Sequence, residues 1–178
     1  TFLIEAAQMS LNIQPGIARR FAFEKLLNFD AAKWQAMREQ AIAAQLPATP
    51  LEIYGSDLYG DALKTSWRNL EEAGLAECVE LKQANILEIS APAERGILVA
   101  NLPFGERMGE LDELEELYPK LGDALKKKFG GWTAYLFTAD KAILKLMRLS
   151  PSKRTPLFNG AIECRLLEYK IVAGSNRS

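Results

Sequence analysis

The most chemically informative stretch of the sequence is Asn101-Leu102-Pro103-Phe104, which directly follows the apolar run 96–100. The asparagine amide oxygen and the next backbone carbonyl offer two acceptors to an exocyclic NH₂ group, and the proline holds this backbone rigid. Phe104 supplies a face on which a nucleic-acid base can stack. A strand-to-loop Asn-x-Pro turn with a core phenylalanine is the alternative interpretation, and the short motif alone favours neither.

An exocyclic amine on a base is a poor nucleophile because its lone pair is delocalised into the ring. Two acceptors on its hydrogens favour the sp³-like geometry in which that lone pair can attack a methyl group. The sequence contains no histidine, which excludes a Ser/His/Asp triad, histidine metal sites and an imidazole base. Amine methylation needs none of these, so it is compatible with the composition.

Two more polar residues follow predicted strands, at the sheet edge where open α/β sheets bind ligands. Asp57 ends the segment 51–57, and its carboxylate can accept hydrogen bonds from two ribose hydroxyls. The alternative is an aspartate that forms a turn or caps a helix. Asn85 follows the predicted strand 78–81 and can contact an adenine edge, although an ordinary loop asparagine explains it as well.

These residues need a scaffold, and hydrophobic periodicity predicts one of alternating helices and strands. Asp30 is the expected N-cap of the second helix, and Pro119 is expected to kink or split the fourth. The alternation indicates an α/β domain with a mainly parallel sheet and one antiparallel terminal strand. Helices are expected at 1–11, 31–45, 61–73, 111–129 and 141–147, and strands at 51–57, 78–81, 96–101, 132–138 and 161–172. The stretch 150–160 is expected to start as a loop and to turn into the last strand as a hairpin.

The bulk composition is that of one ordinary globular domain of 178 residues, with 48% hydrophobic and 25% charged residues. No apolar run approaches the ~18 residues of a membrane-spanning helix. The formal net charge of −1 means that nucleic-acid binding requires a local basic surface or a separate module. Cys78 and Cys164 show no CxxC spacing, which favours reduced, buried cysteines in a cytoplasmic protein.

The motif and several other segments resemble a known family. Asn-Leu-Pro-Phe is similar to the Asn-Pro-Pro-Tyr/Phe motif of amino-methyltransferases, with Leu102 in place of the first proline. Over nearly its whole length, and in the same order, the chain resembles the THUMP-containing ribosomal RNA large-subunit methyltransferase L family. The resemblance rests on Thr-Phe-Leu-Ile-Glu-Ala-Ala at 1–7, Phe-Glu-Lys at 23–25, Tyr-Gly-Ser-Asp at 54–57, Gly-Glu-Arg at 105–107 and Leu-Phe-Asn-Gly-Ala-Ile-Glu-Cys at 157–164.

That resemblance implies a Rossmann-like class I S-adenosylmethionine-dependent methyltransferase. The expected α/β fold has a mainly parallel seven-stranded sheet with an antiparallel terminal strand. Its first strand, the glycine-rich loop and the THUMP domain are expected upstream of Thr1, so residues 1–178 would be an N-terminally incomplete catalytic domain. The implied reaction is methylation of the N2 amine of a guanine in large-subunit ribosomal RNA, with S-adenosylmethionine as cofactor. No metal and no membrane are expected, and the sequence predicts no oligomeric state.

The family's site residues carry over to matching positions. Asp57 would bind the cofactor ribose, Asn85 would sit by the cofactor adenine, and Glu5 would lie near the methionine end. Asn101 to Phe104 would hold the target base, with Asn101 also bordering the cofactor.

Two features of this interpretation stay open. Lys153 and Arg154, in the predicted loop, are candidate contacts to RNA phosphates. The rival functions are an N6-adenine DNA or RNA methyltransferase and a non-catalytic RNA-binding or assembly module, although the intact Asp57 and Asn101 favour an enzyme.

Overall fold

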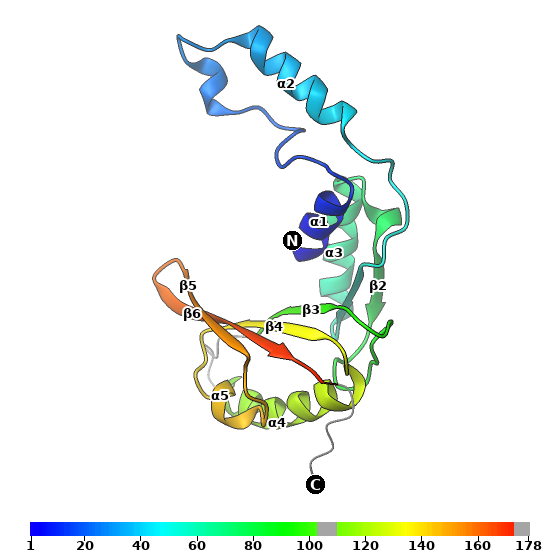
Figure 1. The fold of residues 1–178 in the computed structure, drawn as a ribbon, viewed down its shortest axis with the longest axis vertical. Helices are drawn as coiled ribbons and strands as arrows, with labels where there is room; N and C mark the ends of the chain where they lie inside the picture. The colour runs from blue at the N-terminus through cyan, green and yellow to red at the C-terminus, as the bar shows by residue number, and fades with distance from the viewer. Residues whose placement is uncertain (103–109, 173–178) are drawn as a thin grey trace. The chain divides into compact units, whose positions relative to one another are not determined.

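The structure, a computed structural model, describes residues 1–102 and 110–172, without the side chains of 110–113. The chain divides into two compact units, Thr1–Gln83 and Ala84–Ser178 (Figure 1). Pro103, Phe104 and the Gly-Glu-Arg run at 105–107 lie outside the described residues. The positions of Asn101 and Leu102 can therefore be compared with the sequence predictions, whereas those of Pro103 and Phe104 cannot.

The first unit is built on a parallel pair of short strands, β1 (Tyr54–Asp57) and β2 (Glu80–Gln83), joined through helix α3 (Gly60–Glu72). Helix α1 (Phe2–Ser10) packs beside them, because Leu3 contacts Gly55 so closely that a side chain there would collide with it. The core of this unit consists of Ala7, Leu11, Leu70, Leu75, Cys78 and Val79.

Between α1 and β1 the chain makes a long excursion, residues 14–45, which we call the arm. It contains a 3₁₀ turn, η1 (Ala22–Lys25), and helix α2 (Ala31–Ala43), capped by the Asp30 carboxylate as predicted (Figure 1). The excursion closes on itself, since the amide of Leu46 donates to the carbonyl of Leu11 at 2.9 Å. Neither η1 nor α2, both fully described, contains a buried residue.

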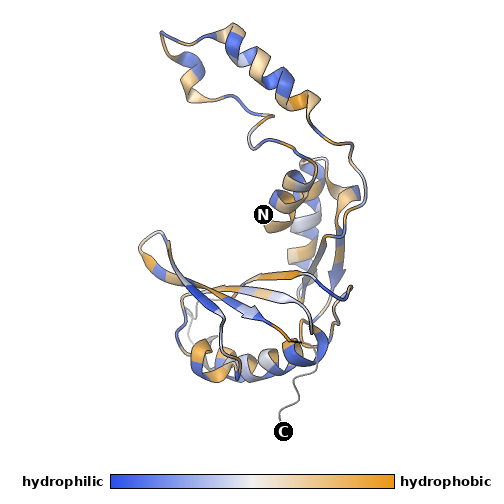
Figure 2. Ribbon diagram, in the orientation of Figure 1, coloured by the Kyte–Doolittle hydropathy of each residue, from blue (hydrophilic) through white to orange (hydrophobic). Residues whose placement is uncertain are grey.

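The second unit is a four-stranded sheet in the order β3-β4-β6-β5. Strands β3 (Ile97–Asn101) and β4 (Thr133–Thr138) are parallel, and β6 (Ile162–Lys170) runs antiparallel to both β4 and β5 (Lys153–Asn159). Figure 2 shows β3 as largely hydrophobic, although it is an edge strand of the described sheet and Ile97 and Val99 are exposed. Helices α4 (Glu110–Lys128) and α5 (Ile143–Leu146) contribute to a core centred on Tyr118, Leu125, Leu136, Ile143, Met147 and Leu167.

The structure corrects three predictions. Cys78 belongs to a 3₁₀ turn, η2 (Ala76–Cys78), and the strand predicted at 78–81 begins only at Glu80, because Cys78 N still donates to Leu75 after α3. The expected hairpin into the last strand is confirmed, but the part expected to be loop is strand β5 from Lys153 on. Pro156 is tolerated there because β5 is an edge strand. Helix α4 continues through Pro119 and is not split. Cys78 and Cys164 are both buried and free, as predicted.

A glycine permits close packing of α5 against α4. A Cβ atom at Gly122, in the middle of α4, would fall on the Met147 carbonyl oxygen that follows α5. Both Gly122 and Met147 are buried, so neither backbone can move away into solvent.

Tyr169 on β6 offers a test of the core of the second unit. Its hydroxyl is buried and has no hydrogen-bond partner among the described residues. Replacing Tyr169 with phenylalanine should therefore leave the free energy of unfolding at neutral pH unchanged or raise it by up to about 1 kcal/mol. Urea denaturation of wild type and variant measures this, and a loss above about 1 kcal/mol would contradict it.

The same residue predicts an alkaline effect. Burial raises the pKa of Tyr169 from 10.0 to about 12, partly offset by the charge of Arg154. The neutral hydroxyl is favoured in the fold, so this contribution to stability is present below pH 10 and lost as the pH rises through about 12. Between pH 10 and about 12, the free energy of unfolding of the Tyr169→Phe variant should fall by roughly 1–2 kcal/mol less than that of wild type. Burial also raises the pKa of Tyr118, so part of the alkaline loss should persist in the variant.

Candidate functional site

The end of β3 places Asn101 at the carboxyl edge of the four-stranded sheet. Asn101 is the last residue of the strand, aligned with Phe137 of β4, and its side chain is exposed. The next residue is fixed, because the Leu102 amide donates to the Phe137 carbonyl at 3.0 Å and its side chain packs on the core. The amide of Asn101 is therefore presented from a rigid strand end, as the sequence predicts.

A hydrogen-bond network holds the neighbouring end of β4. The buried Thr138 hydroxyl accepts from the Asp140 amide at 3.0 Å. The Asp140 carboxylate accepts from the Tyr118 hydroxyl at 2.9 Å and from the Ala142 amide at 2.8 Å. Burial, and secondly this bond to Asp140, raises the pKa of Tyr118, so the phenol stays a neutral donor. The turn after β4, the strand that pairs with β3, is thus held to α4 by the hydrogen bond between Tyr118 and Asp140.

Sequence reasoning missed this network. The Thr-x-Asp pattern directly after a predicted strand is a local signal for such a turn, because both side chains can bond to nearby backbone amides. The partner Tyr118 lies 22 residues away in sequence and is brought there only by the packing of α4.

In the first unit, Asp57 is the last residue of β1 and pairs in register with Gln83 of β2. Its Oδ1 atom accepts from the Tyr59 amide at 2.8 Å, and Gln83 donates to the Leu58 carbonyl at 3.0 Å. Among the described residues only Tyr59 donates to this carboxylate, so its second oxygen can accept from ribose hydroxyls. Asp57 therefore does form a turn, through its bond to the Tyr59 amide, and its second carboxylate oxygen can still bind a ligand.

Glu5 shares the first unit with Asp57. It lies in the first turn of α1 with its side chain exposed. Because α1 packs on β1 through Leu3, Glu5 belongs to the helix next to the strand that carries Asp57.

Asn85 belongs to the second unit, where it forms a turn before β3. Its Oδ1 atom accepts from the Leu87 amide at 3.0 Å. The turn is held to the end of α4, because Lys128 donates to the carbonyls of Leu87 and Glu88, each at 2.8 Å. The side-chain NH₂ group of Asn85 is still able to donate to a ligand.

Lys153 and Arg154 are not in a loop, contrary to the prediction, but are the first two residues of β5, both exposed. Asn101 of β3 pairs with Phe137 of β4, which pairs with Leu166 of β6, which in turn pairs with Thr155 of β5. The residue aligned with Asn101 is therefore Thr155, and not Lys153 or Arg154. Strand β5 is separated from β3 by β4 and β6, so the two strands lie roughly 14 Å apart across the sheet. Arg154 and Lys153 precede, by one and two residues, the β5 position that aligns with Asn101.

The tip of the β5–β6 hairpin extends past the edge that carries Asn101. Phe158 lies three residues beyond the row of Asn101, roughly 10 Å along the strand, and is 73% exposed. An exposed aromatic ring beyond the carboxyl edge suits contact with a substrate base. Phe158 is not among the predicted site residues, and its segment contributes only to the family resemblance. The sequence pattern that could have indicated a functional role is Phe158 directly before an Asn-Gly turn at 159–160.

Within the described ranges 1–102 and 110–172, no group of three or more His, Cys, Asp or Glu side chains could hold a metal ion. No helix in the same ranges is long and apolar enough to cross a membrane.

Comparison with known proteins identifies the family. Residues 1–168 match the model of the family described as "RMKL-like, methyltransferase domain". The chain belongs to this family. The chain is also similar to a protein named ribosomal RNA large subunit methyltransferase K/L from Shewanella baltica, with which it is 43% identical over 181 residues. That alignment covers 99% of this chain and 26% of the relative, so the chain spans about a quarter of the length of the curated relatives it matches.

Solved structures confirm the fold of this RMKL-like domain. SMU.472, crystallised in complex with SAH, matches with a TM-score of 0.88 and 29% identity over 96% of this chain and 45% of its own. A structure described as a predicted N6-adenine-specific DNA methylase from Listeria monocytogenes matches with a TM-score of 0.82 and 27% identity, over 93% of this chain and 42% of its own. The chain therefore has a class I methyltransferase fold.

Proposed function

We propose that the full-length protein transfers a methyl group from S-adenosylmethionine to the exocyclic N2 amine of a guanine in large-subunit ribosomal RNA, in the cytoplasm. The observation that carries the proposal is the exposed Asn101 amide at the rigid carboxyl end of β3, followed by Leu102-Pro103-Phe104 in a chain of the RMKL-like methyltransferase family. The name of the Shewanella relative supports a ribosomal substrate.

For S-adenosylmethionine we propose contacts from residues whose side-chain chemistry suits its parts. The second Asp57 oxygen can accept from the ribose hydroxyls, the Asn85 NH₂ group can donate to the adenine, and Glu5 is assigned to the methionine end. These are neutral or acidic groups, as a cofactor with ribose hydroxyls and an ammonium group requires. When bound, the cofactor supplies the electrophilic methyl group.

The chain's own contribution to the reaction is to hold the amine. The Asn101 amide oxygen and the Leu102 carbonyl would accept its two hydrogens, Pro103 would fix the backbone and Phe104 would stack on the base. The methyl group would pass to the amine nitrogen held by these residues, with the electron pair of the broken carbon–sulfur bond left on the cofactor's sulfur, and the proton released from the nitrogen would go to solvent. Lys153 and Arg154, exposed on the edge strand β5, are proposed contacts to RNA phosphates.

The seven-stranded sheet is also part of the proposal. The described strands form a two-stranded and a four-stranded sheet, in which β1 and β3 are edge strands. The greater length of the curated relatives leaves room for a further strand, a glycine-rich loop and a THUMP domain. We place all three upstream of Thr1 in the full-length protein.

The test is methyl transfer by the full-length protein to ribosomal RNA from cells that lack it, with labelled cofactor and nucleoside analysis. N2-methylguanosine is the expected product. Label on adenine N6 would favour the second candidate, an N6-adenine methyltransferase, which the name of the Listeria structure supports. Label on guanine N7 would contradict the amine mechanism, and no label on RNA or DNA would favour a non-catalytic module.

Replacing Asp57 with alanine tests the cofactor site. We expect weaker binding of S-adenosylmethionine by about tenfold or more, because hydrogen bonds to a charged group contribute about 1.5–3 kcal/mol each. Calorimetry with the full-length protein measures the affinity, with Asp61→Ala on the exposed surface of α3 as the matched control. Unchanged affinity would remove Asp57 from the site.

A further inference from the structure

The arm, residues 14–45, differs in charge from the rest of the chain. It carries five cationic and three acidic side chains, a net charge of +2, whereas the whole chain has −1. The cations are Arg19, Arg20, Lys25, Lys33 and Arg38, and the acids are Glu24, Asp30 and Glu39.

The acidic side chains of the arm are occupied by short-range hydrogen bonds. Glu24 accepts from the Phe21 amide, Asp30 from the Lys33 amide and Glu39 from the Gln35 side chain, each at 2.9 Å. Over the described residues, none of the five cations forms an ion pair with a carboxylate. The four exposed cations, all of them except Arg38, are therefore available to an anionic partner.

Aromatic side chains form the interior of the arm. Trp34 meets Phe21 and Phe23 edge to face, with ring centroids 5.8 and 5.0 Å apart, and Phe21 stacks on Phe23 at 5.4 Å. The Arg19 guanidinium lies 4.6 Å from the centroid of Phe21. A cation is thus placed beside an aromatic cluster in which Phe23 remains 40% exposed.

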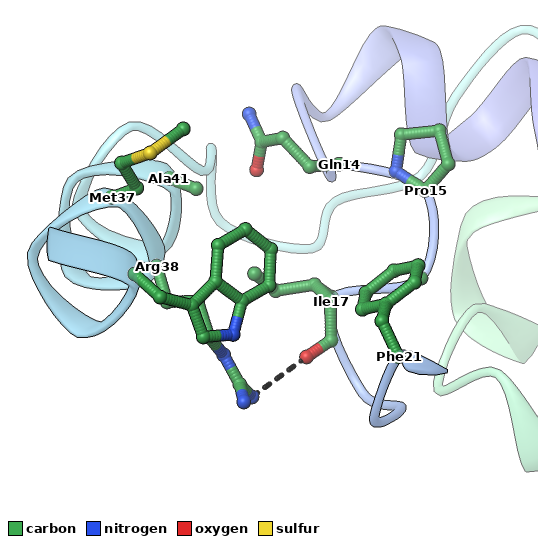
Figure 3. Close-up of a pocket in the computed structure, with 9 residues that line it drawn as sticks. Gln14, Pro15, Ile17, Phe21, Met37, Arg38 and Ala41 are labelled. Atoms are coloured by element: carbon green, nitrogen blue, oxygen red, sulfur yellow. Dashed lines mark hydrogen bonds between the residues drawn. The ribbon is translucent and has the colours of Figure 1, made fainter. Parts of the chain in front are cut away.

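A cavity of about 200 Å³ opens beside this cluster. Figure 3 shows that α2 contributes Met37, Arg38 and Ala41 to one wall, and that Gln14 extends toward α2 from the opposite segment. Arg38 closes one side by donating to the Ile17 carbonyl at 2.9 Å (Figure 3). The cavity is smaller than the ~300–1,000 Å³ of sites for drug-sized ligands, so it suits a single flat ring.

Two buried polar atoms at this cavity have no partner in the described part of the chain. One is an acceptor, Gln14 Oε1, and the other a donor, Trp34 Nε1. Buried polar groups in native proteins are nearly always hydrogen-bonded, so a complementary ligand group is an expected partner for each. A nucleobase offers donors and acceptors on the edge of a flat ring.

We propose that the arm is a second RNA-binding site, at which one unpaired base enters the cavity beside Trp34 while Arg19 and Arg20 contact the neighbouring phosphates. Single-stranded RNA is the occupant that accounts for the unpaired cations, the aromatic cluster and the unpartnered donor and acceptor together. The inference deepens the proposed action on ribosomal RNA and rests on it for the source of the strand.

The charge of the arm is tested with the double variant Arg19→Ala/Arg20→Ala in the full-length protein. Binding of a short single-stranded oligoribonucleotide, followed by fluorescence anisotropy, should weaken about tenfold or more, and the slope of log K against log salt should fall by about 1.4. The matched control is Lys64→Ala/Arg68→Ala on α3, where both cations are exposed and already pair with Asp61 and Glu72. Equal effects of the two double variants would overturn the proposal.

The cavity is tested with Trp34→Phe, which keeps an aromatic ring and removes the unpartnered donor, and with Gln14→Leu, which removes the acceptor. Each should weaken oligoribonucleotide binding roughly three- to tenfold. Gln14→Leu should do so without lowering the melting temperature, because it removes only a buried acceptor with no partner. Trp34→Phe also loses ring contacts with Phe21 and Phe23, so its RNA affinity is measured well below its own melting temperature. A purely structural role predicts no change in RNA affinity, and that result would overturn the cavity assignment.

The same variants separate this inference from the proposed function. If wild type methylates ribosomal RNA and the arm variants keep its KM and kcat, the arm proposal fails and the proposed function stands. If wild type binds the oligoribonucleotide through the arm but methylates no RNA, the arm proposal stands and the proposed function fails. Unchanged RNA binding together with loss of a protein partner would assign the arm to protein recognition and overturn the proposal.

Discussion

Replacing Asn101 with alanine should abolish methyl transfer and leave the affinity for S-adenosylmethionine almost unchanged. Asn101 is exposed at the end of β3, and the following amide is fixed to β4, so truncating its side chain should not disturb the strand. The lost acceptor is assigned to the target amine and not to the cofactor. Removing one preorganised hydrogen-bonding group from a site of developing charge costs about 3–4 kcal/mol, which corresponds to a rate loss of roughly a hundredfold or more.

Single-turnover kinetics with the full-length protein and ribosomal RNA measure the rate, and calorimetry measures the cofactor affinity. Asn69→Ala, at an exposed position of α3, is the control for a general effect of losing an asparagine. A near wild-type rate in Asn101→Ala would exclude the amide from the mechanism. A large loss of cofactor affinity with an unchanged rate at saturation would move Asn101 to the cofactor site.

Among the glycines for which the described residues show what a Cβ atom would meet, Gly122 should be the one whose replacement with alanine destabilises the fold most. Alanine is favoured over glycine inside a helix by about 1 kcal/mol, which alone would stabilise α4. The added Cβ would overlap the Met147 carbonyl oxygen, and the buried backbones of α4 and α5 can separate only by disrupting the core. Overpacking of this kind costs about 1–3 kcal/mol or more, so we expect a net loss of roughly 2–4 kcal/mol.

Urea denaturation measures the loss for Gly122→Ala. Gly60→Ala is the matched control, because Gly60 also lies in a helix and a Cβ there would make only an ordinary contact, 3.4 Å from Gln83. The control should change stability by less than about 1 kcal/mol. An equal, small effect of both substitutions would show that α5 can move away from α4.

The sequence located most helices and strands because their hydrophobic periodicity is strong and local. The run 96–101 became β3, and Asp30 caps α2 as expected. Strand β5 escaped because its residues are mostly polar or exposed, with a proline at its centre, and only pairing with β6 makes it a strand. Pro119 did not split α4, because the neighbouring Tyr118 and Leu121 are buried in the core and hold the helix.

The sequence could predict those site residues whose position depends only on where a strand ends. Asp57 and Asn101 both stand at the carboxyl ends of strands, as their sequence context indicates. The contact between Tyr118 and Asp140 was not predictable, because it depends on how a helix packs against a distant turn. The place of Lys153 and Arg154 depended on the register of β5, which no short pattern encodes.

The closed base of the arm has a consequence for how this domain can vary. Within the first unit, the two ends of the arm are held together where the Leu46 amide donates to the Leu11 carbonyl at 2.9 Å and Asn12 donates to the Ala44 carbonyl at 2.7 Å. The core cluster of that unit includes no residue from 14 to 45. Because the free energy of closing a loop grows only with the logarithm of its length, a much shorter or longer segment could bridge the same two points at little thermodynamic cost. The arm is therefore a replaceable module, whose sequence can diverge without compromising the folding of the unit that carries it.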